Sequence, residues 1–204
     1  MYAKFFKRLL DALLALLGLV ALSPLLLLLT LLGAIMMGGN PFFLQPRPGR
    51  NERIFRLIKF RSMDSRRDAS GQLLPDAQRL NAYGRFLRAS SLDELPELIN
   101  ILKGDMALVG PRPLLVRYLE RYNDFQRRRH EVRPGLTGLA QVHGRNATTW
   151  EERFRWDVEY VDHISFRGDC RILLDTVRAV VRREGISAEG SATMEEFMGN
   201  GEDV

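Results

Sequence analysis

Two adjacent carboxylates, Asp93 and Glu94, stand just before a proline in the stretch SSLDELPELINILKGDM at residues 90–106. An ionised carboxylate can attack an electrophile directly, bind a divalent cation or handle a proton. The same pattern also describes an ordinary helix start, in which Ser91 is the N-cap and Glu94 completes a capping box. Asp93 in the first turn would then only complement the helix dipole. The residues themselves allow both a catalytic and a structural interpretation of this pair.

Residues suited to phosphate binding follow in the second half of the chain. Arg112 lies between Pro111 and Pro113, which fix its backbone, and its planar guanidinium matches phosphate; a surface turn arginine is the alternative. The stretch RPGLTGLAQVHGRN at residues 133–146 is rich in glycine, so its backbone amides could approach a phosphate or a nucleobase closely. It lacks the spacing of a Walker loop. Asp157, in a helical stretch further on, would either face the same cleft or be a surface acid.

The composition indicates a basic protein with an anionic partner. The 204 residues include 30 lysines and arginines against 25 acidic residues, a formal net charge of +5. Basic residues cluster at 126–130 and 178–183, which favours phosphorylated substrates or an anionic membrane. Nucleic acid is disfavoured because aromatic residues do not interleave with the basic runs. A single cysteine, Cys170, excludes an internal disulfide framework, and three scattered histidines give no zinc-site spacing.

The N-terminal segment predicts a membrane anchor. Residues 12–37 are almost wholly apolar, and a spanning helix needs about 20 such residues. Ser23 and Pro24 interrupt the run, so each half reaches only about 16–20 Å. Positive residues flank both ends, and such residues prefer the cytoplasmic side. We therefore expect residues 1–40 to form a re-entrant helix–break–helix; a bitopic span and a signal peptide are the alternatives.

Residues 41–187 are predicted to form one compact, mainly helical cytoplasmic domain, which makes the fold α-rich α+β. We expect a turn-rich exit from the membrane at 38–53, a strand or interfacial segment at 53–63, an exposed loop at 64–78 and a short buried strand at 107–110. Helical patterns cover 79–91, 91–104, 114–130, 150–165 and 167–187. The last is basic and amphipathic, so it would lie in the headgroup plane or dock on the domain. Residues 188–204 are expected to form a loose polar tail.

Five blocks of the sequence together resemble one family. They are KFRSM at 59–63, SLDELPEL at 91–98, LKGDMALVGPRPL at 102–114, RPGLTGLAQVHGRN at 133–146 and WDVEYV at 156–161. In this order they resemble the signature blocks of the bacterial sugar transferases, which are monotopic phosphoglycosyl transferases. The resemblance runs from Met1 to about residue 187. The length and the Ser-Pro break in the anchor are similar to those of the small, PglC-type members.

The resemblance implies an enzyme at the cytoplasmic face of the bacterial inner membrane. Such enzymes use Mg²⁺ and transfer a sugar-1-phosphate from a UDP-sugar to polyprenol (undecaprenyl) phosphate, releasing UMP. The product would initiate a surface glycan or a glycoprotein pathway, with downstream glycosyltransferases as partners and no nucleic acid. By resemblance, Asp93 is the nucleophile that forms a phosphosugar–aspartyl intermediate, and Glu94 assists it through the metal or by proton handling; both are metal-ligand candidates. The implied substrate- and phosphate-binding residues are Lys59, Arg88, Arg112, Gln141, Arg145, Asn146 and Asp157.

Aspartate suits this chemistry because a carboxylate is ionised at neutral pH and its acyl phosphate passes the group on readily. Arginine, lysine and Mg²⁺ would neutralise the phosphate oxygens that otherwise repel an anion. Two other functions fit the residues less well. A non-catalytic, membrane-tethered scaffold of a glycan assembly complex would tolerate Asp93→Asn, and a lipid-diphosphate hydrolase would release phosphate or a lipid monophosphate rather than UMP.

Overall fold

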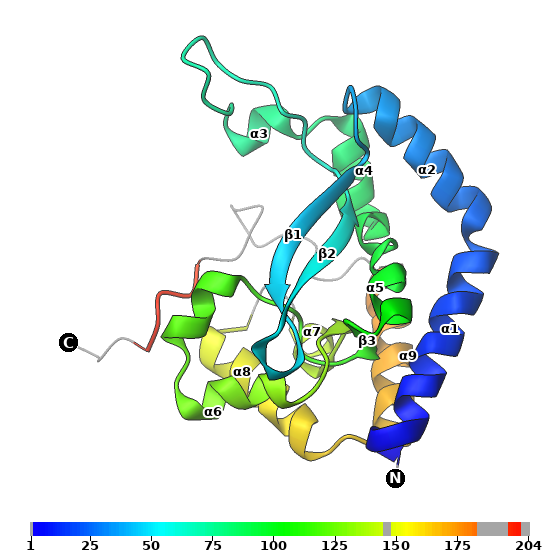
Figure 1. Ribbon diagram of the computed structural model, residues 1–204, viewed down its shortest axis with the longest axis vertical. Coiled ribbons are helices and arrows are strands. Elements are labelled where there is room, and N and C mark those ends of the chain that lie inside the picture. The colour runs from blue at the N-terminus through cyan, green and yellow to red at the C-terminus, as the bar shows by residue number, and fades with distance from the viewer. Residues whose placement is uncertain (1, 145–147, 183–195, 201–204) are drawn as a thin grey trace.

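The computed structural model describes residues 2–144, 148–182 and 196–200. The described residues are mainly helical, as the sequence predicted, and they also form two small two-stranded sheets. Two N-terminal helices form an arc along one side of the molecule (Figure 1). Beside the arc, an antiparallel hairpin runs through the centre of a body that the remaining helices complete.

The arc consists of α1 (Lys7–Ala21), which a π-helical turn η1 (Tyr2–Phe6) precedes, and α2 (Ser23–Met36). The two helices bend by 66° at Leu22, and among the described residues no single helix is long and apolar enough to cross a membrane, although the bent pair is by length and composition. Pro24 lies in the first turn of α2, where its missing N–H is not needed. The Ser23 hydroxyl donates to the carbonyl of Val20 at 2.8 Å. The predicted break is confirmed, one residue before Ser23.

Both helices of the arc pack one face on the body. On α1, Ala15 and Leu19 join a core cluster with Leu57 and Ile101, and Leu29 of α2 joins a second cluster with Phe60 and Leu87. Lys7 pairs with the buried Asp169 at 2.8 Å, while Arg8 donates to the carbonyls of Ile101 and Leu102. The opposite faces carry exposed apolar side chains: Leu9, Leu13, Leu16, Leu17, Val20, Leu27, Leu28, Leu31 and Ile35.

The hairpin pairs β1 (Phe42–Pro48) with β2 (Ile54–Phe60), from Phe42 opposite Phe60 to Pro48 opposite Ile54. A 3₁₀ turn, η2 (Arg50–Glu52), connects them. The turn-rich exit predicted for 38–53 is therefore wrong over residues 42–48, which form β1. Pro46 and Pro48 do not prevent this strand, because proline is tolerated in a strand with a free edge. The segment predicted as strand or interfacial at 53–63 contains a strand, β2, over residues 54–60. Asn100 covers the other edge of β2, accepting from the amide of Ile58 at 3.0 Å and donating to the carbonyl of Arg56 at 2.8 Å.

The predicted loop at 64–78 is largely irregular and ends in α3 (Asp76–Arg79). Three short helices follow: α4 (Ala82–Ser90), η3 (Leu92–Glu94) and α5 (Glu97–Lys103). The side chain of Asn81 caps α4 by accepting from the amide of Gly84 at 2.9 Å. Ser91 ends α4 in the left-handed conformation, with φ of 56°, and so turns the chain into η3.

The strand predicted near 107–110 is β3 (Ala107–Val109), which pairs in parallel with β4 (Gly135–Thr137). Gly110 and Gly135 meet so closely that a Cβ on Gly135 would lie 2.1 Å from the amide nitrogen of Gly110. The single helix predicted over 114–130 is wrong. The segment contains η4 (Val116–Arg121), α6 (Asp124–Arg127) and η5 (Arg128–Glu131), because Tyr122 is extended and Asn123 starts a new helix through a capping box.

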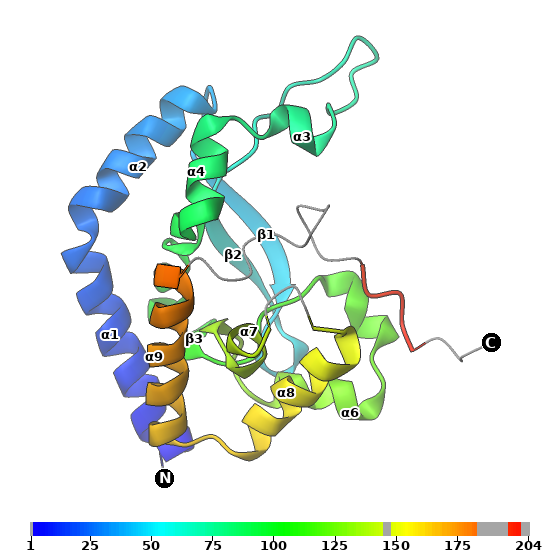
Figure 2. The same ribbon diagram turned by 180° about the vertical axis from the view of Figure 1, so that it is seen from behind.

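The last elements are α7 (Leu139–Val142), α8 (Trp150–Asp162) and α9 (Phe166–Arg182), and the two long ones confirm the predicted helices. In both views α9 lies beside α1 (Figure 2). Residues 183–187 of the predicted helix lie outside the described residues. The expected loose tail contains a packed residue: Phe197 is 4% exposed and lies in an aromatic cluster with Tyr118, Tyr122, Trp150 and Phe154.

Candidate active site

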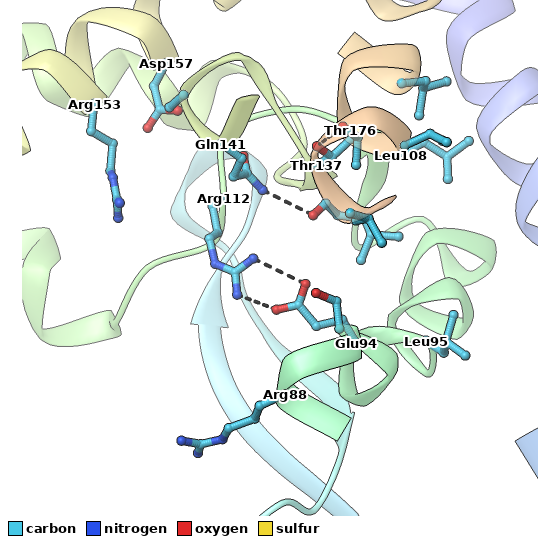
Figure 3. Close-up of a pocket in the computed structure, with 16 residues that line it drawn as sticks. Arg88, Glu94, Leu95, Leu108, Arg112, Thr137, Gln141, Arg153, Asp157 and Thr176 are labelled. Carbon is cyan, nitrogen blue, oxygen red and sulfur yellow. Dashed lines mark hydrogen bonds and ion pairs between the residues drawn. The ribbon is translucent and has the colours of Figure 1, made fainter. Parts of the chain in front are cut away.

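Glu94 lies between two cations. Its Oε1 accepts a hydrogen bond from Lys59 of β2 at 2.7 Å, and Arg112 donates to both carboxylate oxygens (Figure 3). Burial alone would raise the pKa of Glu94, but Arg112 and Lys59 outweigh burial and hold that pKa well below its usual range. The capping box predicted for Ser91 and Glu94 is wrong, because Ser91 is left-handed and its side chain caps no amide. The Glu94 side chain instead forms a charge cluster with Lys59 and Arg112.

Arg112 reaches the cluster from the loop after β3. Its backbone is fixed by the flanking prolines and by Arg129, whose Nη2 donates to the Arg112 carbonyl at 2.7 Å. Arg129 is itself buried against Asp157, with nitrogen–oxygen distances of 3.0 and 2.8 Å. Asp157 is therefore a buried acid beside the cleft and not a surface residue. Its direct contact with Arg129 makes it a support of the Arg112 loop.

Asp93, the neighbour of Glu94, is half-buried, and within the described part of the chain its carboxylate makes no hydrogen bond or ion pair. Burial, and then the charge of Glu94, raise the pKa of Asp93, whereas Lys59, Arg112 and Arg88 oppose that rise. The three cations favour the ionised form that a nucleophile requires. Asp93 is thus a carboxylate without an ion-pair partner in the described residues, and three cations partly offset the rise in its pKa.

Glu97 is a member of this cluster that the sequence did not single out. It is 2% exposed and its Oε1 lies 3.1 Å from Lys59 Nζ. Burial raises the pKa of Glu97 to about 7, with the charge of Glu94 adding to the rise and Lys59 and Arg112 opposing it. The one signal available in the sequence is its spacing, three residues after Glu94.

A cavity of about 480 Å³ opens beside the cluster, and we call it the main cavity. Five predicted site residues line it: Arg88, Glu94, Arg112, Gln141 and Asp157. Figure 3 shows Arg88, Arg112 and Glu94 on one side of the space and Thr137, Thr176 and Leu108 on the other. A second space of about 260 Å³ holds Lys59 and Glu97 and shares Arg112 and Arg153 with the main cavity. Arg153 is a further residue that sequence reasoning missed.

The remaining predicted residues are distributed as follows. Asp93 lines neither space but adjoins Glu94. Arg88 Nε donates to Ser62 Oγ at 3.0 Å, which ties the helix before the acidic pair to the KFRSM block. Gln141 Nε2 donates to the Leu136 carbonyl at 3.1 Å, whereas its Oε1 has no hydrogen-bond partner in the described residues. Arg145 and Asn146 lie outside the described residues.

The acidic residues fit a magnesium ion only in part. Within the described ranges, no group of three or more His, Cys, Asp or Glu side chains is arranged to hold a metal. Mg²⁺, however, commonly binds through one or two carboxylates together with substrate phosphates. The carboxylate of Asp93 fits that role, since it has no competing ion pair, while Glu94 already faces two cations. The donor set therefore suits a metal that arrives with a phosphorylated substrate.

The basic run at 126–130 does not form a free cationic surface. Arg127 pairs with Glu52, Arg128 with Asp162, and Arg129 with Asp157. His130 is buried, and burial lowers its pKa to about 3, so it is neutral. Among the described residues, the arginines that line the main cavity are Arg88, Arg112 and Arg153, of which Arg112 is paired with Glu94.

Comparison with known proteins gives a consistent result. The sequence profile of the bacterial sugar transferase family matches residues 2–183. An uncharacterized sugar transferase, EpsL of Bacillus subtilis, is 49% identical over 196 residues, which are 96% of this chain and 97% of EpsL. The undecaprenyl-phosphate galactose phosphotransferase of Salmonella typhimurium is 38% identical over 90% of this chain but only 42% of its own length. The UDP-glucose:undecaprenyl-phosphate glucose-1-phosphate transferase of Caulobacter vibrioides is 38% identical over 86% of this chain and 69% of its own.

Proposed function

Because the chain belongs to the bacterial sugar transferase family, we propose that it transfers a sugar-1-phosphate from a UDP-sugar to polyprenol (undecaprenyl) phosphate. The products are UMP and a polyprenyl-diphosphate-linked sugar that starts a glycan or glycoprotein. The observation that carries this proposal is the carboxylate of Asp93, which has no ion pair in the described residues and adjoins Glu94, a residue that lines the main cavity together with Arg88, Arg112 and Arg153.

In the first step, a carboxylate oxygen of Asp93 attacks the β-phosphorus of the UDP-sugar. The bond from that phosphorus to the bridging oxygen breaks, and UMP leaves with the oxygen. In the second step, an oxygen of the lipid phosphate attacks the same phosphorus, the aspartyl–phosphorus bond breaks, and the carboxylate of Asp93 is restored. The transferred phosphoryl group has the same charge before and after each step. The same cations can therefore stabilise it in both steps.

The cations have separate roles. Arg88, Arg112 and Arg153 face the main cavity and would bind phosphate oxygens, which otherwise repel an incoming anion. Lys59 and Arg112 keep Glu94 ionised, so Glu94 fixes the direction of the Arg112 fork. Mg²⁺ would be held by Asp93 and the substrate phosphates, and it would supply neutralisation of the developing charge; Glu94, already paired with Lys59 and Arg112, could join as a ligand only by giving up one of these pairs.

The arc of α1 and α2 supports a monotopic, re-entrant attachment to the cytoplasmic leaflet of the inner membrane. Both helices touch the same body on one face and expose leucines on the other, and each is too short to cross alone. Lys7 and Arg8 at the start of the arc bind the body directly, which is compatible with an N-terminus on the side of the catalytic domain. A lipid phosphate at the headgroup level would then be within reach of the site.

The test is intact-protein mass spectrometry after incubation with a panel of UDP-sugars and Mg²⁺, without lipid, while UMP is measured in parallel. We expect a mass gain of one sugar-phosphate that polyprenol phosphate removes. Asp93→Asn should give no adduct, whereas Asp124→Asn, a change at an exposed acid of α6, should behave like the wild type. UMP release that needs lipid and never gives an adduct would replace the covalent route by direct displacement. No UMP from any donor, with or without lipid, would contradict the transferase.

A further inference from the structure

The main cavity has a second wall that the phosphate chemistry does not use. Besides the arginines, it is lined by apolar side chains, which we call the apolar wall: Leu95, Leu108, Leu136, Leu173, Val177 and Val180. The Thr137 and Thr176 hydroxyls in this wall bond to each other at 2.7 Å and therefore offer little to a ligand. A nucleoside or a sugar placed here would press its hydroxyls against hydrocarbon, which costs free energy. The wall suits an apolar group attached to a phosphate.

The apolar wall is also in contact with the clusters on which the helices α1 and α2 pack. Leu108 and Leu136 pack against the core cluster that contains Ala15 of α1, as does Leu19 of the same helix. Leu95 packs with the cluster that contains leucines of α2. The remaining side chains of the wall come from α9, which lies beside α1 in both views (Figures 1 and 2). Apolar side chains therefore connect the cavity to α1 and α2, and these two helices expose leucines on the face that points away from the body.

The rim of the wall is accessible. Val177 is 61% exposed and Val180 is 40% exposed, although both line the cavity. An apolar chain that leaves the cavity would cross these two side chains. We infer that the apolar wall formed by Leu95, Leu108, Leu136, Leu173, Val177 and Val180 binds the isoprene units nearest the phosphate of the lipid acceptor. This inference rests on the proposed function, because it assigns a place to that reaction's second substrate.

The size of the cavity limits what it holds. A volume of about 480 Å³ is typical of a site for one small molecule. It therefore accommodates the acceptor phosphate beside Arg88, Arg112 and Arg153, which we call the arginine wall, and the adjoining isoprene units on the apolar wall. The rest of the chain passes over Val177 and Val180 to the lipid. Donor and acceptor use the arginine wall in turn, as the two-step reaction requires.

The test compares two exposed apolar residues of α9 that differ in position. Val177→Asn changes the rim, and Leu174→Asn is the matched control, because Leu174 is 59% exposed and does not line the cavity. Acceptor kinetics are measured in detergent micelles with undecaprenyl phosphate and with a two-unit citronellyl phosphate. Replacing apolar contact over one to two methylene groups by an amide predicts a fall in kcat/KM of about tenfold for both acceptors in Val177→Asn. Leu174→Asn should change it by less than about twofold.

Adduct formation from the UDP-sugar, recorded before lipid is added, separates the two proposals. If the wild type forms the adduct and Val177→Asn forms it at the same rate, a slower discharge by lipid supports the apolar wall as the acceptor site. Equal losses in both α9 variants would overturn the inference in favour of general lipid contact. A slower adduct formation in Val177→Asn would assign the wall to the donor. A wild type that releases no UMP would overturn the proposed function itself, and the inference with it.

Discussion

Replacing Glu97 by glutamine should make the protein more stable at alkaline pH and leave it unchanged at acidic pH. Glu97 is buried beside Glu94, and its pKa is raised from 4.5 to about 7. The folded protein therefore holds this proton more tightly than the unfolded chain does. The stability that the proton provides is fully present below pH 4.5 and is lost progressively as the pH rises to about 7.

The size of the effect follows from the same shift. A difference of between two and three pKa units corresponds to about 3 kcal/mol of folding free energy, which the ionised Glu97 costs above pH 7. Glutamine has the same shape and no charge to desolvate, and Lys59 keeps Glu94 as its partner. For a chain of this size, about 3 kcal/mol corresponds to a rise in Tm of about 6–12 °C.

The assay is thermal unfolding in detergent, followed by tryptophan fluorescence at about pH 4 and about pH 8. Glu97→Gln should exceed the wild type in Tm at the higher pH and match it at the lower. Glu120→Gln, which removes an exposed acid from η4, serves as the control and should change neither value. A constant Tm difference between Glu97→Gln and the wild type at both pH values would refute the reasoning, as would a larger benefit in acid.

Three further changes probe other parts of the molecule. Asp157→Asn leaves Arg129 buried without its counter-charge and should cost about 3–5 kcal/mol in urea unfolding; a loss below 1 kcal/mol would contradict the pairing. Phe197→Ala empties a position in the aromatic cluster and should cost about 3–5 kcal/mol by the same measurement, and no loss would mean that the segment is not packed. Pro24→Ala should straighten the arc and expose a tagged N-terminus to external thiol reagents; unchanged labelling would disconnect Pro24 from topology.

The sequence correctly predicted those elements that are determined by neighbouring residues in the chain. The Ser23-Pro24 dipeptide marks the bend because proline cannot donate a backbone hydrogen bond, and the apolar periodicity of 150–165 predicted α8. The single helix over 114–130 failed because its apolar spacing continues across Tyr122, whereas the backbone is extended there. Periodicity reports which side chains are apolar, and it does not report where the backbone leaves the helix.

Within the site, the surroundings of Asp93 and Glu94 could likewise not be predicted from the local sequence pattern. The pattern at Ser91 and Glu94 matches a capping box, yet Ser91 is needed in a left-handed conformation to end the preceding helix. The partners of Glu94 come from β2 and from the loop after β3, so its ion pairs depend on tertiary structure. Glu97 was missed for this reason as well, since its raised pKa arises from burial that the spacing alone does not reveal.

The ion pair between Lys7 and Asp169 has a consequence for how the protein is made. The two residues are separated by 162 positions, so at about 5–20 residues per second the ribosome adds Asp169 roughly ten to thirty seconds after Lys7. During this interval α1 and α2 have been made, but α1 still lacks its contact with α9. Their apolar faces must be covered by lipid or by a chaperone from the start of synthesis. Folding of the body therefore completes the attachment of the first two helices to it, and does not initiate their burial.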